Sequence, residues 1–470
     1  MRHSPPGAEF AARGRAGGGG GSGGAGGKRR ATSGNLQVTE SRVVATLILS
    51  DLRSGILLDQ SFERRSAPLD ARDRRWLQEL VWGMLRRRSW IDAVLDARIK
   101  GGLSRIDADV TDLLRLAVYQ LIAMGSVPAY AAIAQMVELT KRRHGIGAGG
   151  LANAVLRRID REREALEPVA PSDSIDALAL RYSHPRWVIA RWLGQWSYDE
   201  VETLLAANNT EAPIVARPWG TSSAELAEML SAAGVAATEA PLDVDGLLLQ
   251  GGVSLIDLGA FKQGMMFVQD PAATLVTRYA AFGEGNVVAD LCAAPGGKAL
   301  ELSRRAARVV ASDRNRLRVE RMLVGFGRLD CSNIEVLVAD AQNPAIREVD
   351  AVLVDVPCTG TGTFRRHPDA RWRLRVSDLA VMGALQRDIL RSAASRVRPG
   401  GLLVYSTCSL EPEENDEMID SFLAANPDYT LEAPPVGAVP QSTLDNGRLR
   451  VLPHIHGTDG AFAARMRRRA

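Results

Sequence analysis

The sequence predicts a multidomain α/β protein: an all-α helical bundle, then a small α/β subdomain, then a doubly wound sheet domain. Over the front third, apolar residues recur every three or four positions, which is typical of packed helices. From residue 286 onward, short apolar runs alternate with helical stretches, which is typical of parallel strands buried on both faces. The 470 residues suffice for two or three domains of about 100 to 200 residues each.

The front third of the chain is basic. Residues 1–36 are Gly-rich and dotted with Arg, a composition that predicts a disordered tail. We expect residues 37–168 to form the all-α domain, cut into short helices by breaks at Gly101-Gly102 and Pro128. Residues 1–165 carry 27 basic and 17 acidic side chains, a balance of +10, whereas the whole chain has +3. This asymmetry favours a polyanionic partner.

The remaining boundaries follow from composition. Residues 167–174 contain prolines and are the expected linker. Residues 175–265 mix helical and strand-like pieces and predict a small α/β linking subdomain, so that residues 266–470 form the sheet domain.

Several classes of protein are disfavoured. No stretch approaches the roughly 20 uncharged apolar residues of a membrane helix, and the N-terminus lacks the apolar segment of a secretory signal. We therefore expect a cytoplasmic protein without membrane contact. Four cysteines without CxxC spacing predict neither a disulfide framework nor a zinc site. No metal is expected, and a monomer is expected.

Five apolar runs are expected to form the parallel strands of the sheet domain. Ligands bind beyond the carboxyl ends of such strands, so the residues that end each run are candidates for a site. The runs are residues 286–292, 308–313, 334–340, 351–355 and 401–407.

The first three runs predict a nucleoside pocket. The first leads into a glycine turn that opens a helix, where glycines let the backbone approach a ligand closely. The turn matches neither a Walker A sequence nor GxGxxG. Asp313 ends the second run, where a carboxylate can accept hydrogen bonds from ribose hydroxyls, and Asp340 ends the third and can address a base. The turn consists of Cys292, Ala293, Ala294, Pro295, Gly296, Gly297 and Lys298.

The fourth and fifth runs bring two cysteines. Asp355 ends the fourth run and Cys358 follows it, while Cys408 ends the fifth. Two thiols beside a carboxylate suit methylation of a pyrimidine at C5, because that carbon becomes nucleophilic only after a thiolate adds at C6. A buried aspartate with a raised pKa suits the hydrogen bond to N3, and a second group must assist release. The residues alone leave open which cysteine attacks.

These strings resemble the bacterial Sun (RsmB) group of the NOL1/NOP2/Sun family, which are S-adenosylmethionine-dependent RNA cytosine-C5 methyltransferases. The family signature runs acid, apolar run, acid, Ala or Val, Pro, Cys, Ser or Thr, Gly, and residues 350–360 fit it. The resemblance covers residues 180–470 and includes Glu413-Glu414-Asn415 and Asp459-Gly460-Ala461-Phe462. The front domain resembles the RNA-binding fold of the NusB antitermination factor. A NusB-like bundle and a Rossmann-like methyltransferase domain are therefore implied.

The resemblance implies methyl transfer from S-adenosylmethionine to C5 of a cytidine in small-subunit (16S) ribosomal RNA, in a single-stranded or loop region. It implies that the turn from Cys292 to Lys298, with Asp313, Asp340 and Asp355, contacts the methyl donor. Cys408 is then the attacking thiol, and Cys358 assists release. Val356, Thr359 and Ala461 depart from the commoner residues but remove no reacting group.

Two alternatives remain at this stage. The same chemistry on transfer RNA is one, and a noncatalytic RNA-binding or antitermination factor is the other; two aligned cysteines argue against the latter. Arg365, Arg366 and His367 follow Cys358 on a loop and are expected to meet phosphate.

Overall fold

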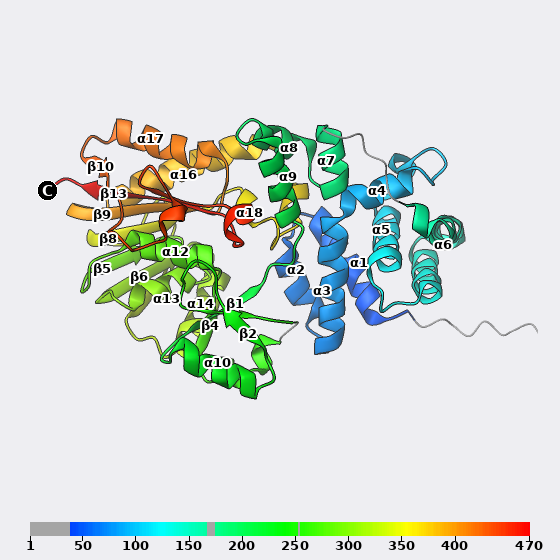
Figure 1. The fold of residues 1–470 in the computed structure, drawn as a ribbon, viewed down its shortest axis with the longest axis horizontal. Coiled ribbons are helices and arrows are strands. Elements are labelled where there is room, and N and C mark those ends of the chain that lie inside the picture. Colours follow the sequence, from blue (N-terminus) through cyan, green and yellow to red (C-terminus); the bar gives the residue numbers. More distant parts are fainter. Residues whose placement is uncertain (1–37, 167–173, 252–253) are drawn as a thin grey trace, which may run out of the picture. The chain divides into compact units, whose positions relative to one another are not determined.

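The structure is a computed structural model that describes residues 38–166, 174–251 and 254–470 (Figure 1). The expected tail, residues 1–36, and nearly all of the expected linker lie outside the described residues.

The front domain is an all-α bundle, as predicted. Two of its helices begin at aspartates whose side chains accept backbone N–H groups: Asp70 caps α3 and Asp107 caps α5. The longest helix, α6, bends at Gly145, which has a positive φ of 88°. Leu77, Leu80 and Leu156 are fully buried in the core of the bundle. The helices are α1 (Glu40–Arg53), α2 (Leu58–Ser66), α3 (Ala71–Arg86), α4 (Arg88–Asp96), α5 (Ala108–Ala123) and α6 (Ala129–Arg161).

Two smaller parts follow. Helices α7 (Ile175–Tyr182), α8 (Arg186–Leu193) and α9 (Tyr198–Ala207) share a core with Phe364 and Leu410 of the sheet domain. An antiparallel sheet in the order β2-β3-β1-β4 then packs on helices α10 and α11 and has a core of its own. Its elements are β1 (Ile214–Pro218), α10 (Ser223–Ala232), β2 (Ala237–Glu239), β3 (Leu247–Leu249), α11 (Gly259–Lys262) and β4 (Met266–Val268).

The large sheet has five parallel strands in the order β7-β6-β5-β8-β9. All five overlap the predicted runs, with shifted ends except at β6: β5 (Val287–Asp290), β6 (Arg308–Asp313), β7 (Ile334–Val338), β8 (Val349–Asp355) and β9 (Val397–Thr407). Successive residues of a strand point to opposite faces. Val288 therefore packs in one core and Ala289 in the other.

Helices cover both faces of the sheet, which confirms the doubly wound architecture (Figure 1). Helices α12 (Pro271–Ala280), α13 (Gly297–Ser303) and α14 (Arg316–Arg328) pack on one face. Helices α16 (Val376–Ala394) and α17 (Asp416–Ala425) pack on the other.

Beyond β9 the sheet continues with antiparallel strands that the sequence analysis did not identify. Strand β13 pairs with β9 and also contacts β10 and β12, and β11 pairs with β12. They are β10 (Tyr429–Leu431), β11 (Leu444–Asp445), β12 (Arg448–Val451) and β13 (Ala461–Arg468). At the opposite edge, β7 exposes Glu335 and Val338, so it is not buried on both faces as the apolar runs suggested.

Pairing between β8 and β9 sets the geometry of the two cysteines. Asp355 lies opposite Ser406 in the register, so the residues that follow both strands emerge side by side. None of the helices in the described parts of the chain is long and apolar enough to cross a membrane.

Candidate functional site

A cavity of about 400 Å³ opens at the carboxyl ends of the parallel strands. The glycine turn after β5 forms one wall, and Phe326 at the end of α14 forms another. Cys292, Ala293, Ala294, Pro295, Gly297, Lys298 and Asp355, all predicted site residues, line it.

Glycine is required sterically at one position of the turn. Gly296 has φ +106°, and a Cβ there would lie 2.8 Å from the Phe326 ring. A Cβ on Gly297 would lie 2.9 Å from the Gln269 side chain, which also lines the cavity. A side chain at Gly296 would push the turn away from Phe326 in a backbone that favours glycine, whereas the amide end of Gln269 could shift to admit one at Gly297.

The two predicted nucleoside carboxylates differ. Asp313 ends β6 and is buried; it accepts the Asn315 N–H at 2.9 Å and forms an ion pair with Arg318 at 3.3 Å. Asp340 lies two residues beyond β7, is exposed, and accepts the Gln342 N–H at 2.9 Å. Neither is among the residues that line the cavity. Asp340 lies outside the cavity because β7 is the strand at the edge of the sheet.

Lys298 and Asp355 form an ion pair at the cavity wall. Lys298 Nζ lies 2.7 Å from Asp355 Oδ2, and Ser406 Oγ donates to Oδ1 at 2.8 Å. Burial opposes the charge on Lys298, but the neighbouring Asp355 raises the pKa of the ammonium overall. Lys298 and Asp355 are therefore held together as an ion-paired unit at the cavity wall.

Asp290 is a site residue that the sequence analysis missed. It ends β5, is fully buried and lines the cavity, and neither carboxyl oxygen has a hydrogen-bond partner among the described residues. Burial, with the nearby Asp355 charge, raises the pKa of Asp290 to about 7. The sequence does show an acidic residue at the end of this buried strand. That its carboxyl group has no hydrogen-bond partner is visible only in the tertiary structure. Asp290 is therefore a candidate site residue in addition to the predicted Asp355.

The two predicted thiols meet. Cys358 Sγ and Cys408 Sγ lie 3.3 Å apart, and both side chains are partly exposed. The hydrogen bond to Cys408, together with burial, raises the pKa of the Cys358 thiol well above its ordinary value. Burial also raises the pKa of Cys292, whereas Cys331 lies apart, with Sγ 3.4 Å from Ser303 Oγ.

The arginine loop after Cys358 has another role than the one expected. Arg365 and Arg366 both pair with Asp270 and Asp459, at 2.8 to 3.2 Å. His367 pairs with Asp59 of α2 at 3.0 Å. These cations are neutralised internally, so the expectation that they meet phosphate is not supported by their contacts. Their carboxylate partners come from segments about 90 or more residues away.

A second cavity, of about 1330 Å³, lies between the bundle and the parts that follow it. Arg75, Arg86 and Arg87 of the α3 segment line it together with Arg366, which also lines the smaller cavity. The Arg87 side chain is exposed. Arg86 donates to the Arg365 carbonyl at 2.9 Å and thereby ties the bundle to the arginine loop.

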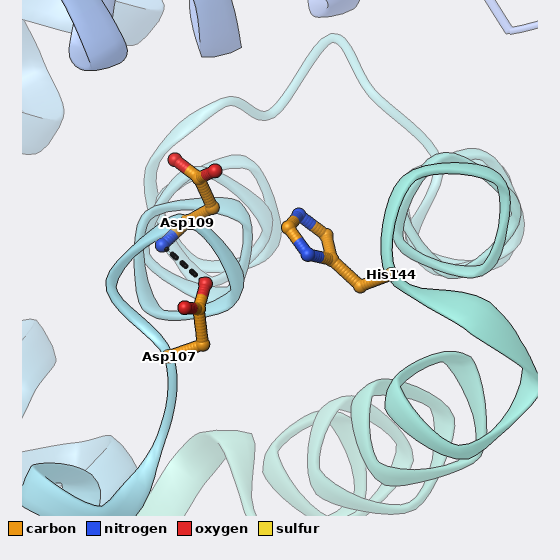
Figure 2. Close-up of side chains that lie close together, drawn as sticks. All are labelled: Asp107, Asp109 and His144. Carbon is orange, nitrogen blue, oxygen red and sulfur yellow. Dashed lines mark hydrogen bonds between the residues drawn. The ribbon is translucent and has the colours of Figure 1, made fainter.

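One group in the described residues has the composition of a metal site: Asp107, Asp109 and His144 (Figure 2). Asp107 is the cap of α5 and accepts the Asp109 N–H at 2.9 Å. Asp109 forms an ion pair with Arg53. Both carboxylates therefore already have partners within the protein: Asp107 caps a helix, and Asp109 pairs with the side chain of an arginine.

Three family models match successive parts of the chain. The NusB family matches residues 39–161. A ferredoxin-like domain of RsmF/B-like methyltransferases matches residues 184–255, and the 16S rRNA methyltransferase RsmB/F family matches residues 280–467.

Relatives match nearly the whole chain. A probable ribosomal RNA small subunit methyltransferase B of Synechocystis is 32% identical over 91% of this chain and 99% of its own length. Ribosomal RNA small subunit methyltransferase B of Vibrio cholerae is 35% identical over 84% of this chain and 89% of its own. A solved methyltransferase homolog from Pyrococcus horikoshii is 26% identical, with a TM-score of 0.54, over 63% of this chain and 100% of that one. The predicted resemblance is confirmed, and the chain belongs to the RsmB/F family of small-subunit ribosomal RNA methyltransferases.

Proposed function

We propose that the chain transfers a methyl group from S-adenosylmethionine to C5 of a cytidine in small-subunit ribosomal RNA, through a covalent cysteine adduct at C6. The observation that carries this proposal is the pair of thiols 3.3 Å apart, beside the Lys298–Asp355 ion pair and the small cavity. Covalent activation of a pyrimidine needs a nucleophile, a proton-holding group and a second group for release. The site supplies a group of each kind: two cysteines and the Lys298–Asp355 pair.

The small cavity fits the methyl donor. Its volume falls within the range of about 300 to 1,000 Å³ that is common for small-molecule sites. The unpartnered carboxyl group of Asp290 offers an acceptor for the donor's ammonium group, and the glycine turn gives close backbone approach. When bound, S-adenosylmethionine supplies the activated methyl group. Asp313, close behind the turn, is the candidate for the ribose hydroxyls, whereas the exposed Asp340 is a weaker candidate for the base.

Cys408 is the proposed nucleophile. Its thiolate sulfur forms the bond to C6, and the electrons of the C5=C6 bond become available at C5. Asp355 and Lys298 hold the proton that stabilises the charge developing at N3. After C5 is methylated, the Cys358 thiol first loses its own proton to water, and its thiolate then takes the C5 proton. The electrons of that C–H bond restore the double bond, and the C6–S bond breaks with its electron pair returning to Cys408.

The substrate must present its base outside a stacked helix, because C5 and C6 have to be approached from both faces. The large cavity is lined by five arginines and three acidic residues, and adjoins the small one at Arg366. It supports binding of a single-stranded or loop segment of RNA. Ribosomal RNA as the substrate would place the protein in the cytoplasm.

The test compares two alanine variants. Cys408→Ala is expected to form no adduct with RNA, because no thiolate adds at C6. Cys358→Ala is expected to add and to methylate but to release slowly, so that a protein–RNA adduct survives denaturing electrophoresis. Cys331→Ala is the matched control and should behave like the wild type. Adducts from Cys408→Ala rather than Cys358→Ala would reverse the assignment, and no adduct from any variant would contradict the covalent mechanism.

The substrate class is tested in the same assay. Small-subunit ribosomal RNA and total transfer RNA are offered in parallel with labelled donor, and bisulfite mapping locates the methylated cytidine. Methylation of transfer RNA alone would overturn the ribosomal assignment. If the protein binds RNA whether or not S-adenosylmethionine is present and methylates neither RNA, a noncatalytic RNA-binding factor is favoured.

A further inference from the structure

The segment that carries Cys358 is held by one buried carboxylate. Glu414, in the turn after β9, has no exposed surface. Its Oε1 accepts the Thr359 N–H at 2.9 Å, and its Oε2 accepts the Thr359 hydroxyl. Gln386 Nε2 of α16 donates to the same Oε1 at 2.8 Å and to the Pro357 carbonyl at 2.9 Å. The residues on both sides of Cys358 are therefore tied to Glu414.

All three groups around the Glu414 carboxylate are arranged as donors, an arrangement that suits an ionised carboxylate. No lysine, arginine or histidine of the described residues forms an ion pair with it, although Arg191 pairs with both Glu411 and Glu413 nearby. Glu414 is thus a buried negative charge without a neutralising cation. Such a charge acts strongly on its neighbours because the surrounding dielectric is low.

The charges around the two thiols differ in sign. The hydrogen bond to Cys408 and burial contribute most to the raised pKa of Cys358, and the Glu414 carboxylate adds to that rise, whereas the ammonium of Lys298 interacts with Cys408. Tyr405 also faces Cys358, but burial raises the pKa of its hydroxyl and keeps it neutral. The thiols themselves share one hydrogen bond and can donate in either direction. The surrounding charges therefore distinguish the two sulfurs.

We propose that Glu414 is a positioning residue that selects the attacking thiol: it fixes the Cys358 segment from both sides and keeps Cys358 protonated, so that Cys408 carries the thiolate. This inference rests on the proposed function and deepens it, because it supplies a reason within the fold for one cysteine to attack and the other to assist release. A protonated Cys358 also donates its S–H to the Cys408 sulfur, which favours the thiolate there.

The test measures thiol reactivity without RNA or donor. The full-length protein is alkylated with iodoacetamide over a series of pH values, and mass spectrometry gives the labelled fraction at Cys358 and at Cys408. Because only the thiolate reacts, the wild type should label at Cys408 at a lower pH than at Cys358. Glu414→Gln keeps the shape but removes the charge, and should raise the reactivity of Cys358 relative to Cys408 by about tenfold for each pKa unit regained.

Two controls separate charge from packing. Glu413→Gln makes the same chemical change on the partly exposed neighbour, which pairs with Arg191, and should leave the labelling ratio unchanged. Thr359→Val removes a hydrogen bond but leaves the Glu414 charge, and should keep the preference for Cys408. If Thr359→Val shifts the ratio as far as Glu414→Gln does, Glu414 acts through structure alone and the inference falls.

Other outcomes are also decisive. Equal labelling of the two cysteines in the wild-type protein overturns the inference without any variant, and so does an unchanged ratio in folded Glu414→Gln. Methylation of RNA by the wild type is measured alongside. If labelling shifts as expected but RNA is not methylated, the proposed function fails and the thiol selection stands; if RNA is methylated but labelling does not shift, only the selection fails.

Discussion

Replacing Asp290 with asparagine should stabilise the unliganded protein, and by an amount that grows with pH. Asp290 is fully buried without a hydrogen-bond partner among the described residues, and burial raises its pKa from the ordinary 3.8 to about 7. Below about pH 4 the carboxyl group is protonated in both the folded and the unfolded chain. As the pH rises, the unfolded chain releases the proton first, while the folded chain keeps it until about pH 7. The folded state therefore loses stability across this interval.

The size of the effect follows from the pKa difference. At 1.36 kcal/mol per unit, a rise from 3.8 to about 7 corresponds to about 4 kcal/mol of lost stability above pH 7. The asparagine side chain carries no charge, so Asp290→Asn should gain up to that amount at pH 8 and nothing at pH 4. For a domain of this size, about 4 kcal/mol is roughly 10 °C in the melting temperature.

Scanning calorimetry of the full chain over this pH range measures the gain, and the S-adenosylmethionine complex provides a second readout. The donor's ammonium should bind less well to the variant, by about ten- to a hundred-fold in Kd, because a charge-assisted hydrogen bond contributes about 1.5 to 3 kcal/mol. Asp313→Asn is the control for the stability measurement alone, since Arg318 and the Asn315 amide already partner that carboxylate. A gain that is absent at pH 8, or equal at every pH, would refute the reasoning.

Three further predictions concern the cavity and its supports. Gly296→Ala should abolish donor binding in calorimetric titration, because its Cβ would meet the Phe326 ring at 2.8 Å in a backbone with positive φ, whereas Gly327→Ala, with open space around it, should bind normally. Arg365→Met leaves two buried carboxylates without their inner cation, and should lower the free energy of unfolding by about 3 to 5 kcal/mol in urea titration. Residues 174–470 alone should still bind the donor, because every residue that lines the small cavity lies there; a folded fragment that fails to bind would contradict this.

The local features of the catalytic domain were predictable from the sequence. Strands β5, β6 and β8 are short apolar runs flanked by helices, and a central parallel strand needs no distant information to be recognised. The glycine turn was recognisable for the same reason, since its steric requirement resides in its own residues. The cysteines that follow β8 and β9 were also identified, because their positions depend only on where each strand ends.

The contacts of the arginine loop were not predictable. Arg365 and Arg366 follow Cys358 on a loop, which is a common setting for phosphate contacts. Their partners Asp270 and Asp459 come from segments about 90 or more residues away, and no local pattern reveals that these segments converge. The arginine charges of this loop, which would be unpaired in an isolated segment, are therefore neutralised by carboxylates in the folded protein.

The sequence by itself determined which residues stand at strand ends, because strand formation follows from the local alternation of apolar runs and turns. Only the tertiary structure decided what surrounds them. Pairing of β8 with β9 brings Cys358 and Cys408 to 3.3 Å, placement of β7 at the edge leaves Asp340 exposed, and burial without partners gives Asp290 its raised pKa. The reason is physical: burial and electrostatic environment are set by neighbours that are close in space but distant along the chain.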